Sequence, residues 1–398
     1  MIKHLFKMVW NRKRTNFLIT VEIFISFLVL FAVMVLAVYY TDNYRQPLGF
    51  NYENVWSVEV NMQGGAATPE QKQARLNTLK QLFASTREFD EIESAALAET
   101  TPYSGGSSST NYDFNGRALD YEINTVTDSF KEVMGLTLVA GRWFGREDDG
   151  VSFRPLVINE RLARAAFGDE DPLGKSLQSP TDKTETRVIG VVTDFRKDGE
   201  FAGPGGYCFE RYTMTDPKAW MPQTVMLKVR PNTTAALEER LIDRFQAIAR
   251  DWSFDIQPVA EVRETVNGQR LAPVITAGLV AGFLMIMVAL GLTGVLWQNV
   301  TQRTREIGLR RAKGATARKI HSQILGELLV ITTFGLLAGV AVVMQFPLLD
   351  LVAFISAKVY AVGLVLSLAL IYLLTILCGL YPSRLATRVH PAEALHYE

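Results

Sequence analysis

The chain of 398 residues carries 41 basic and 41 acidic side chains, which gives a formal net charge of zero, and 48% of its residues are hydrophobic. These averages would suit a soluble protein and exclude nothing among peptide, lipid or small amphiphilic ligands. We expect no nucleic-acid partner. The distribution of residues along the chain is more informative than the averages.

The N-terminal segment 1–16 is basic and precedes an apolar run, 17–40, which is long enough to cross a membrane as a helix. Apolar residues of the segment fall on one helical face, which indicates a cytoplasmic or interfacial helix. A cleaved signal peptide also has a basic head before an apolar run. That alternative is disfavoured because the run exceeds the roughly 7–15 residues of a signal-peptide core and no A-x-A-like site follows Tyr40.

Residues 41–270 mix the periodicities of strands and helices, which predicts a large α+β domain that ends in a stalk helix, 260–270. The expected elements are strands at 55–60, 92–98, 121–127, 156–159, 187–193, 224–229 and 254–259, helices at 69–86, 130–134 and 233–251, and a flexible loop at 101–111. That loop and the segment 198–222 are predicted places for an inserted subdomain. Cys208 lies in this domain and Cys378 in the last apolar run, so we expect no intrachain disulfide.

A basic segment, 299–323, lies between two further apolar runs, 271–298 and 324–345. From Asn299 to Ser322 it has seven Lys or Arg residues against one acid, Glu306. Short loops of this composition stay on the cytoplasmic side of the membrane during insertion. The segment therefore predicts a cytoplasmic loop between the second and third spans.

The last apolar run, 359–381, follows a turn of low charge at 346–358 and precedes a tail at 382–398. A cytoplasmic loop between the second and third of four spans places both termini in the cytoplasm, and the low charge of the turn agrees with an outer position. The sequence thus predicts a membrane α-helical protein with four transmembrane helices and a large α+β extracytoplasmic domain between helices 1 and 2.

Motifs for chemistry are weak. The stretch GDEDPLGKS at 168–176 is similar to a P-loop, but it has five residues between its glycines instead of four, and Pro172 removes a backbone donor. We read the acidic residues Glu147, Asp148 and Asp149 as a solvated loop in preference to a cation site, and we expect no metal site. No catalytic residue is predicted.

Glu22 is the one clear carboxylate within a predicted span, and ionisable residues at such positions are costly and often functional. It lies about one and a half turns beyond Phe17, so an anchoring role near the interface remains open beside a role in coupling or transport. The residues of the basic segment have two interpretations as well. They could bind a partner protein, or they could be topogenic arginines that contact only lipid phosphates.

The stretch TREIGLRRAKGATARKI at 304–320 resembles, nearly position for position, the cytoplasmic segment of the FtsX/MacB-type ABC transporter permeases. The end of the chain, GLYPSRLATRVHPAEALHYE at 379–398, resembles the end of that family. GLTLVAGRWF at 135–144, DPLGKSL at 171–177 and RVIGVVTDFR at 187–196 resemble parts of the MacB-like periplasmic core domain. The resemblance covers nearly the whole chain and is most specific in the basic segment and the tail.

The resemblance implies a permease of the bacterial inner membrane that pairs with a second permease, the same or a related chain, and binds two ABC ATPase subunits, which hold ATP and Mg. It also implies that the basic segment forms a coupling helix seated on the ATPase. The contact residues carried over are Arg303, Arg305, Glu306, Ile307, Gly308, Arg310, Arg311, Gly314 and Ala315. Some relatives of the MacB type carry their own ATPase, but these 398 residues contain no Walker A motif, so we expect a separate ATPase chain and no cofactor bound here.

The function implied is mechanotransmission, in which ATP hydrolysis moves the outer domain and drives efflux or extraction of a substrate on the outer side, with a periplasmic adaptor or outer-membrane protein as a further partner. Two alternatives stay open. One is a non-transporting regulator of a periplasmic or cell-wall enzyme, and the other is a membrane sensor that needs no ATPase.

Overall fold

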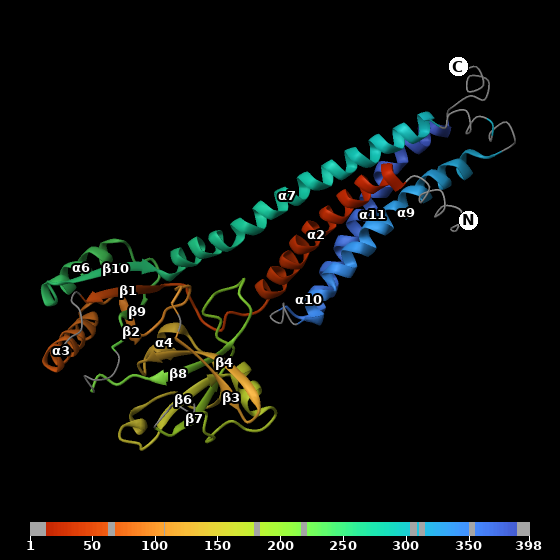
Figure 1. Ribbon diagram of the computed structural model, residues 1–398. Helices are drawn as coiled ribbons and strands as arrows, with labels where there is room; N and C mark the ends of the chain where they lie inside the picture. Colours follow the sequence, from red (N-terminus) through yellow and green to blue (C-terminus); the bar gives the residue numbers. More distant parts are fainter. Residues whose placement is uncertain are drawn as a thin grey trace. The chain divides into compact units, whose positions relative to one another are not determined.

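The computed structural model describes residues 13–62, 68–106, 108–178, 184–215, 221–302, 309, 315–349 and 355–387. They form two compact units (Figure 1). We call Asn43–Arg270 the sheet unit and the segments Met1–Asp42 and Leu271–Glu398 the helical unit. Each unit has its own hydrophobic core, and each is described separately below.

Four helices are long and apolar enough to cross a membrane in the part of the chain that the structure describes. They are α2 (Lys13–Tyr44), α7 (Val259–Gln302), α9 (Ala317–Val343) and α11 (Ala357–Thr387), and a short helix, α10 (Gln345–Leu348), follows α9. Three of the four predicted spans fall within these helices, and the third, 324–345, ends two residues past α9. Helix α11 extends past the predicted end at 381, and α10 occupies the first part of the predicted turn at 346–358.

The helical unit packs around α2, whose buried side chains Ile23 and Phe27 lie in one cluster with residues of α7, α9 and α11. Small residues let these helices approach closely. A Cβ placed on Gly339 of α9 would lie 2.3 Å from the Phe27 ring, so that position accommodates glycine alone without rearrangement. The membrane-spanning part therefore forms one packed bundle and not four independent helices.

The sheet unit contains a ten-stranded mixed sheet with the strand order β10-β1-β9-β2-β4-β8-β6-β7-β5, and β3 pairs with β4 outside this path. The first four strands of that order form an antiparallel group in which two βαβ-like segments interleave. The group consists of β1 (Val55–Met62), α3 (Pro69–Ser85), β2 (Ile92–Ala98), β9 (Thr224–Val229), α6 (Ala236–Ile248) and β10 (Trp252–Pro258). This order and connectivity are those of a ferredoxin-like fold.

Alternation along these strands divides their side chains between two faces of the sheet. In β9, Val225, Leu227 and Val229 pack in the core under α3 and α6, whereas Met226 belongs to a second core on the opposite face. Helix α3 begins with a capping box, in which Thr68 and Gln71 bond each other's backbone N–H groups. Local sequence and long-range packing therefore agree in this half.

A short 3-10 turn, Thr86–Glu88, precedes β2, and the end of α2 and the first turns of α7 also belong to the sheet unit. The other elements lie between β2 and β9 in the sequence, in residues 99–223, which we call the insert. They are β3 (Ser108–Phe114), β4 (Arg117–Val126), α4 (Phe130–Met134), β5 (Leu138–Gly141), a 3-10 turn at Arg146–Asp148, β6 (Arg154–Asn159), α5 (Glu160–Phe167), β7 (Thr186–Val192) and β8 (Gly206–Arg211). Ala98 of β2 pairs directly with Thr224 of β9. The two ends of the insert therefore lie on adjacent strands.

Part of the predicted flexible loop at 101–111 is in fact a strand, because β3 begins at Ser108 and pairs along its length with β4. A two-residue turn, Asn115–Gly116, joins them with φ angles of 54° and 78°. Asn-Gly is the preferred pair for this tight hairpin. Helix α5 and strand β8 were also absent from the predicted elements.

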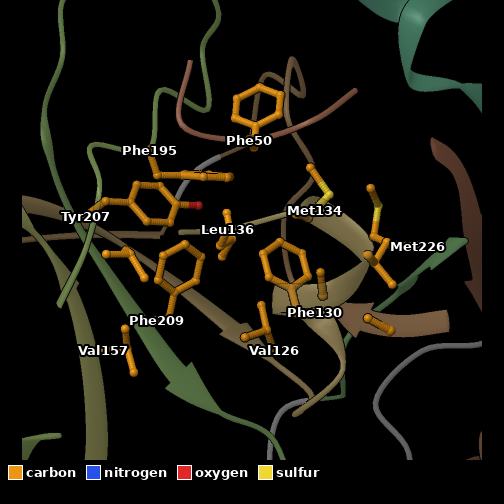
Figure 2. Close-up of a cluster of buried hydrophobic side chains, with 14 of the residues drawn as sticks. Phe50, Val126, Phe130, Met134, Leu136, Val157, Phe195, Tyr207, Phe209 and Met226 are labelled. Carbon is orange, nitrogen blue, oxygen red and sulfur yellow. The ribbon is translucent and has the colours of Figure 1, made fainter. Parts of the chain in front are cut away.

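The core on the second face of the sheet is rich in aromatic residues (Figure 2). Phe209 of β8 lies at its centre, with ring centroids 5.0 to 5.8 Å from Tyr207, Phe195, Trp143 and Phe130. Such distances are typical of favourable aromatic pairs. This core joins the insert to the ferredoxin-like half and to the first turns of α7, through Val259.

Candidate functional site

The predicted coupling segment is bordered by two helix ends that the structure describes. Helix α7 ends at Gln302, and α9 begins after Thr316, whose hydroxyl accepts a hydrogen bond from the Lys319 N–H at 3.4 Å. Ala315 is half-buried and lies just before this cap. The other eight predicted contact residues lie outside the described residues: Arg303, Arg305, Glu306, Ile307, Gly308, Arg310, Arg311 and Gly314.

Glu22 lies on α2 and is half-buried within the helical unit. Its carboxylate packs against α7 where that helix has no side chain, because a Cβ placed on Gly291 would lie 2.7 Å from Glu22 Oε2. The predicted intramembrane carboxylate therefore contacts a neighbouring helix. Gly291 lies within the predicted span 271–298, and nothing in the sequence pattern indicated its partner.

The first turns of α7 carry a second polar contact, which belongs to the sheet unit. Arg263 Nε donates to Glu200 Oε1 at 2.5 Å, and Asn267 Nδ2 donates to Glu200 Oε2 at 3.1 Å. Burial alone would raise the pKa of Glu200, but the hydrogen bonds from the backbone, Arg263 and Asn267 outweigh it and hold that pKa below its ordinary value. Glu200 is therefore a buried carboxylate that stays charged and binds α7.

The predicted stalk, 260–270, thus has a specific polar partner. Arg263 also stacks on the ring of Tyr52, with 4.5 Å between the guanidinium carbon and the ring centroid. The sequence pointed to none of these contacts, since Glu200, Tyr52 and Arg263 are far apart along the chain and carry no motif.

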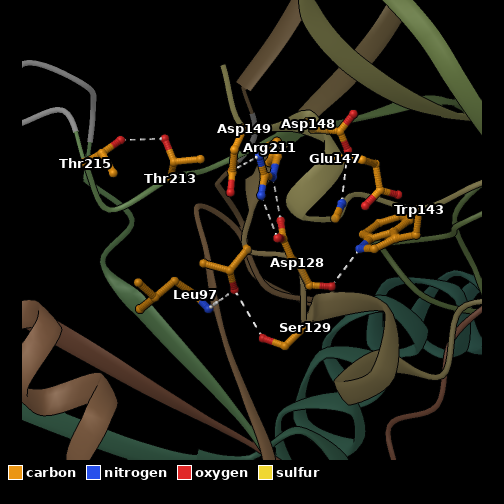
Figure 3. Close-up of polar contacts among 12 residues, drawn as sticks. Leu97, Asp128, Ser129, Trp143, Glu147, Asp148, Asp149, Arg211, Thr213 and Thr215 are labelled. Carbon is orange, nitrogen blue, oxygen red and sulfur yellow. Dashed lines mark hydrogen bonds and ion pairs between the residues drawn. The ribbon is translucent and has the colours of Figure 1, made fainter. Parts of the chain in front are cut away.

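The segment GRWFGREDD at 141–149 is held by two arginines (Figure 3). Arg142 binds both carboxylate oxygens of Asp148 at 2.5 and 2.7 Å, and Arg211 binds Asp128 at 2.7 and 2.8 Å and Asp149 at 2.8 Å. The Asp148 side chain is fully buried, so its assignment to a solvated loop was wrong. These bonds join the two arginines and the three aspartates in ion pairs whose role is to hold the segment in place.

Trp143 fixes the same segment from its apolar side. Its indole N–H donates to the Asp128 carbonyl at 2.8 Å (Figure 3). Its ring packs on Phe209, with 5.4 Å between the ring centroids. No cluster of three His, Cys, Asp or Glu side chains suited to a metal ion occurs among the described residues.

The P-loop-like segment 168–176 has a geometry unlike a phosphate cradle. The Gly174 N–H donates to the Val188 carbonyl at 2.8 Å, and the Lys175 N–H donates to the Pro172 carbonyl at 3.2 Å. Lys175 itself pairs with Glu170. Two backbone donors and the ammonium group that would hold a phosphate are therefore already engaged.

Two family models match the chain. Residues 17–245 match the MacB-like periplasmic core domain, and residues 278–391 match the FtsX-like permease C-terminal model. The macrolide export ATP-binding/permease protein MacB of Bdellovibrio bacteriovorus is 26% identical over 326 residues, which are 76% of this chain and 48% of that protein. The uncharacterized ABC transporter permease YknZ of Bacillus subtilis is 24% identical over 296 residues, 70% of each chain.

Among solved structures, the periplasmic region of MacB from Actinobacillus actinomycetemcomitans is 20% identical, with a TM-score of 0.38, and the match covers 54% of this chain and 93% of that one. The chain spans about half the length of the MacB proteins of Bdellovibrio bacteriovorus and Marinobacter nauticus that it matches. Together the two family models cover both the sheet unit and the helical unit. The chain belongs to the FtsX/MacB-type ABC transporter permeases.

Proposed function

We propose that this chain is a non-catalytic permease subunit that converts ATP hydrolysis by a separate ATPase pair into movement of the sheet unit outside the membrane. The movement drives efflux or extraction of a substrate on the outer side. The permease works in the bacterial inner membrane with both termini in the cytoplasm, and it pairs with a second permease, the same or a related chain.

One observation carries this proposal. Helix α7 contains residues of both units, from Val259, which lies in the aromatic core of the sheet unit, to Gln302, which lies within the basic segment 299–323. Continuous backbone hydrogen bonding makes a helix more rigid than a loop, so a displacement at one end is passed along it, although Pro273 removes one backbone donor within α7. The basic segment is then the place where the ATPase would apply force.

The described residues of the helical unit offer few ionisable groups for a transport path through the bilayer. Its polar contacts among the described residues include the Glu22–Gly291 packing and hydroxyl pairs such as Thr332–Thr375. A self-contained ion carrier would place several ionisable groups along a path. The arrangement supports work done by the sheet unit, with an adaptor or outer-membrane protein receiving the substrate.

The proposal is tested by purifying the chain from its native membranes in mild detergent, identifying partners by mass spectrometry, and measuring vanadate-sensitive ATP hydrolysis. We expect an ABC ATPase to copurify with activity. A copurifying cell-wall hydrolase without an export partner would instead favour the regulator. Recovery of the chain without any ATPase would contradict the proposal and favour a sensor.

A further inference from the structure

The loop that follows β7, residues 194–202, contacts both segments of the sheet unit that lead into the membrane helices. We call it the joint loop. Its Arg196 is almost completely buried and donates four hydrogen bonds to main-chain carbonyls. The acceptors are Asn43 at 2.8 Å, Gln46 at 3.0 Å, Glu200 at 2.8 Å and Ala202 at 2.7 Å. Two of these bonds therefore fix the end of α2 and the residues just after it.

Further contacts support the same attachment. The Asn43 side chain donates to the Phe201 carbonyl at 3.3 Å, and the rings of Tyr44 and Phe201 stack with centroids 5.7 Å apart. The Arg196 N–H donates to the Leu48 carbonyl at 3.0 Å. The joint loop thus holds the α2 side mainly through the Arg196 guanidinium, whose acceptors are main-chain carbonyls, so this side does not depend on a carboxylate.

The α7 side is held differently. Glu200 of the joint loop binds Arg263 and Asn267, and Asp198 lies 3.8 Å from Arg270, all through side chains. Arginine–carboxylate hydrogen bonds are strong when partly buried, but they are lost together when the carboxylate is removed. One carboxylate, that of Glu200, accounts for the two shortest of these contacts. The α7 side is therefore the side on which one carboxylate supplies most of the polar attachment, beside the apolar packing of Val259, Val262 and Val266.

The conformation of the joint loop is itself fixed by contacts with other parts of the sheet unit. Lys197 is buried, and its ammonium group binds Glu122 at 3.0 Å and the Gly106 carbonyl at 2.8 Å. Gly199 has φ +86°, and a Cβ there would lie 2.4 Å from the Tyr103 ring, whose hydroxyl donates to Glu200 at 3.3 Å. The Phe195 ring packs on Phe50 and on Tyr207 in the aromatic core (Figure 2). The loop is a rigid seat for Glu200.

We propose that the joint loop attaches the sheet unit to both membrane-connecting helices. Its Glu200 is the positioning residue that holds the base of α7, residues 259–270, in a fixed position relative to the end of α2. This inference rests on the proposed function, because it assigns the place where movement along α7 enters the sheet unit. Loss of the Glu200 charge frees the base of α7 while the α2 side stays attached.

The first experiment needs no ATPase and measures amide hydrogen exchange in the full chain in detergent. In Glu200→Gln, exchange in residues 259–270 should accelerate by about tenfold, the effect of losing one charge-assisted bond. Exchange in α3 should not change. The matched control is Glu88→Gln, which removes another arginine–carboxylate pair of the same unit, with Arg244 at 2.7 and 2.9 Å, away from the joint loop.

The exchange rates of single and double variants distinguish a role of Glu200 through Arg263 from a general structural role. If Glu200 acts through Arg263, the double variant Glu200→Gln with Arg263→Gln should exchange no faster at 259–270 than the faster single variant. Asn267→Ala removes only the 3.1 Å bond and serves if Glu200→Gln fails to fold, with a smaller acceleration expected at the same residues. Unchanged exchange at 259–270 in these variants would overturn the proposal.

The second experiment uses the complex with its ATPase and measures the distance between spin labels at Lys72→Cys on α3 and Leu279→Cys on α7, with both native cysteines replaced by serine. The distance should shift on vanadate trapping, and Glu200→Gln should abolish most of that shift while ATP hydrolysis continues. No shift in the unmodified complex would contradict the proposed function. A full shift in Glu200→Gln would contradict the joint loop alone.

Discussion

Gly141 shows at the scale of one residue how closely the insert is packed. It ends β5 with φ +69°, and a Cβ there would lie 2.3 Å from the Ile189 carbonyl oxygen. We predict that Gly141→Ala lowers the free energy of unfolding by about 2–4 kcal/mol, because a left-handed backbone and a main-chain clash add together. Urea unfolding of the full-length protein, followed by pulse proteolysis of the sheet unit, measures the loss.

Gly116 provides the control for that prediction. It also has a positive φ, +78°, but no atom lies within 4 Å of an added Cβ. Gly116→Ala should therefore cost only about 1 kcal/mol. Equal losses in the two variants would show that backbone conformation alone, and not the contact with Ile189, limits residue 141.

Asp148 makes the stability of residues 141–149 dependent on pH. Burial would raise the pKa of this carboxyl, but hydrogen bonds from Arg142 and the Gly145 N–H outweigh burial and hold it below the ordinary value. A lowered folded pKa means that the stabilisation is complete above the unfolded pKa of about 3.9 and is lost as pH falls through the folded value. We predict that amide exchange in residues 141–149 accelerates below about pH 4.

The variant Asp148→Asn isolates this group. It should weaken protection of 141–149 already at neutral pH, by about 1–2 kcal/mol, and remove much of the acid dependence there. A pH profile identical to that of the unmodified chain would mean that other carboxylates dominate.

Individual residues also show which parts of the structure could be predicted from the sequence. The periodicities of β1, β9 and α3 identified those elements correctly, since these signals are local. Strand β3 was missed because SSTNYDF lacks an apolar alternation; the Asn115–Gly116 pair, a hairpin signal, could have identified it. Glu200 could not be found, because its role depends on Arg263 and Asn267, more than sixty positions away.

At the scale of elements, α9 and α11 share a buried hydroxyl pair, Thr332 and Thr375, 3.1 Å apart. The Thr375 hydroxyl already donates to the Ile371 carbonyl at 2.9 Å, so Thr332 must be the donor of the pair. We predict that Thr375→Val costs about 1–2 kcal/mol because it leaves a buried donor unpaired, and that Thr332→Val costs about 0.6 kcal/mol. Thermal unfolding of the full chain in detergent ranks the two variants.

The exposed Thr276 of α7, whose hydroxyl bonds only the Ala272 carbonyl of its own helix, is the control. Thr276→Val should leave the unfolding temperature nearly unchanged. A larger loss in Thr332→Val than in Thr375→Val would reverse the assigned donor.

The basic segment between α7 and α9 is the element on which the transmission proposal depends. We predict that reversing charge at Arg310 and Arg311, each to Glu, uncouples ATP hydrolysis from movement of the sheet unit in the purified complex. The matched variant reverses Arg318 and Lys319, exposed basic residues of the same segment that lie at the start of α9 and are not among the carried-over contact residues. Full coupling in the Arg310 and Arg311 variant would count against docking at this segment and favour contacts with lipid phosphates.

At the scale of the whole molecule, composition along the chain was enough to predict four spans and a large α+β domain, because a bilayer imposes a length and a charge pattern that local sequence must satisfy. No comparable rule predicts the strand order of the sheet. The pairing of β1 with both β9 and β10 joins residues nearly two hundred positions apart, and only the folded chain brings them together.

The pairing of Ala98 with Thr224 has an evolutionary consequence. Since the insert begins and ends on neighbouring strands, its length can grow, shrink or be exchanged between relatives without moving the strands on either side. The ferredoxin-like half is then a constant frame whose strand pairing does not depend on the length of the insert.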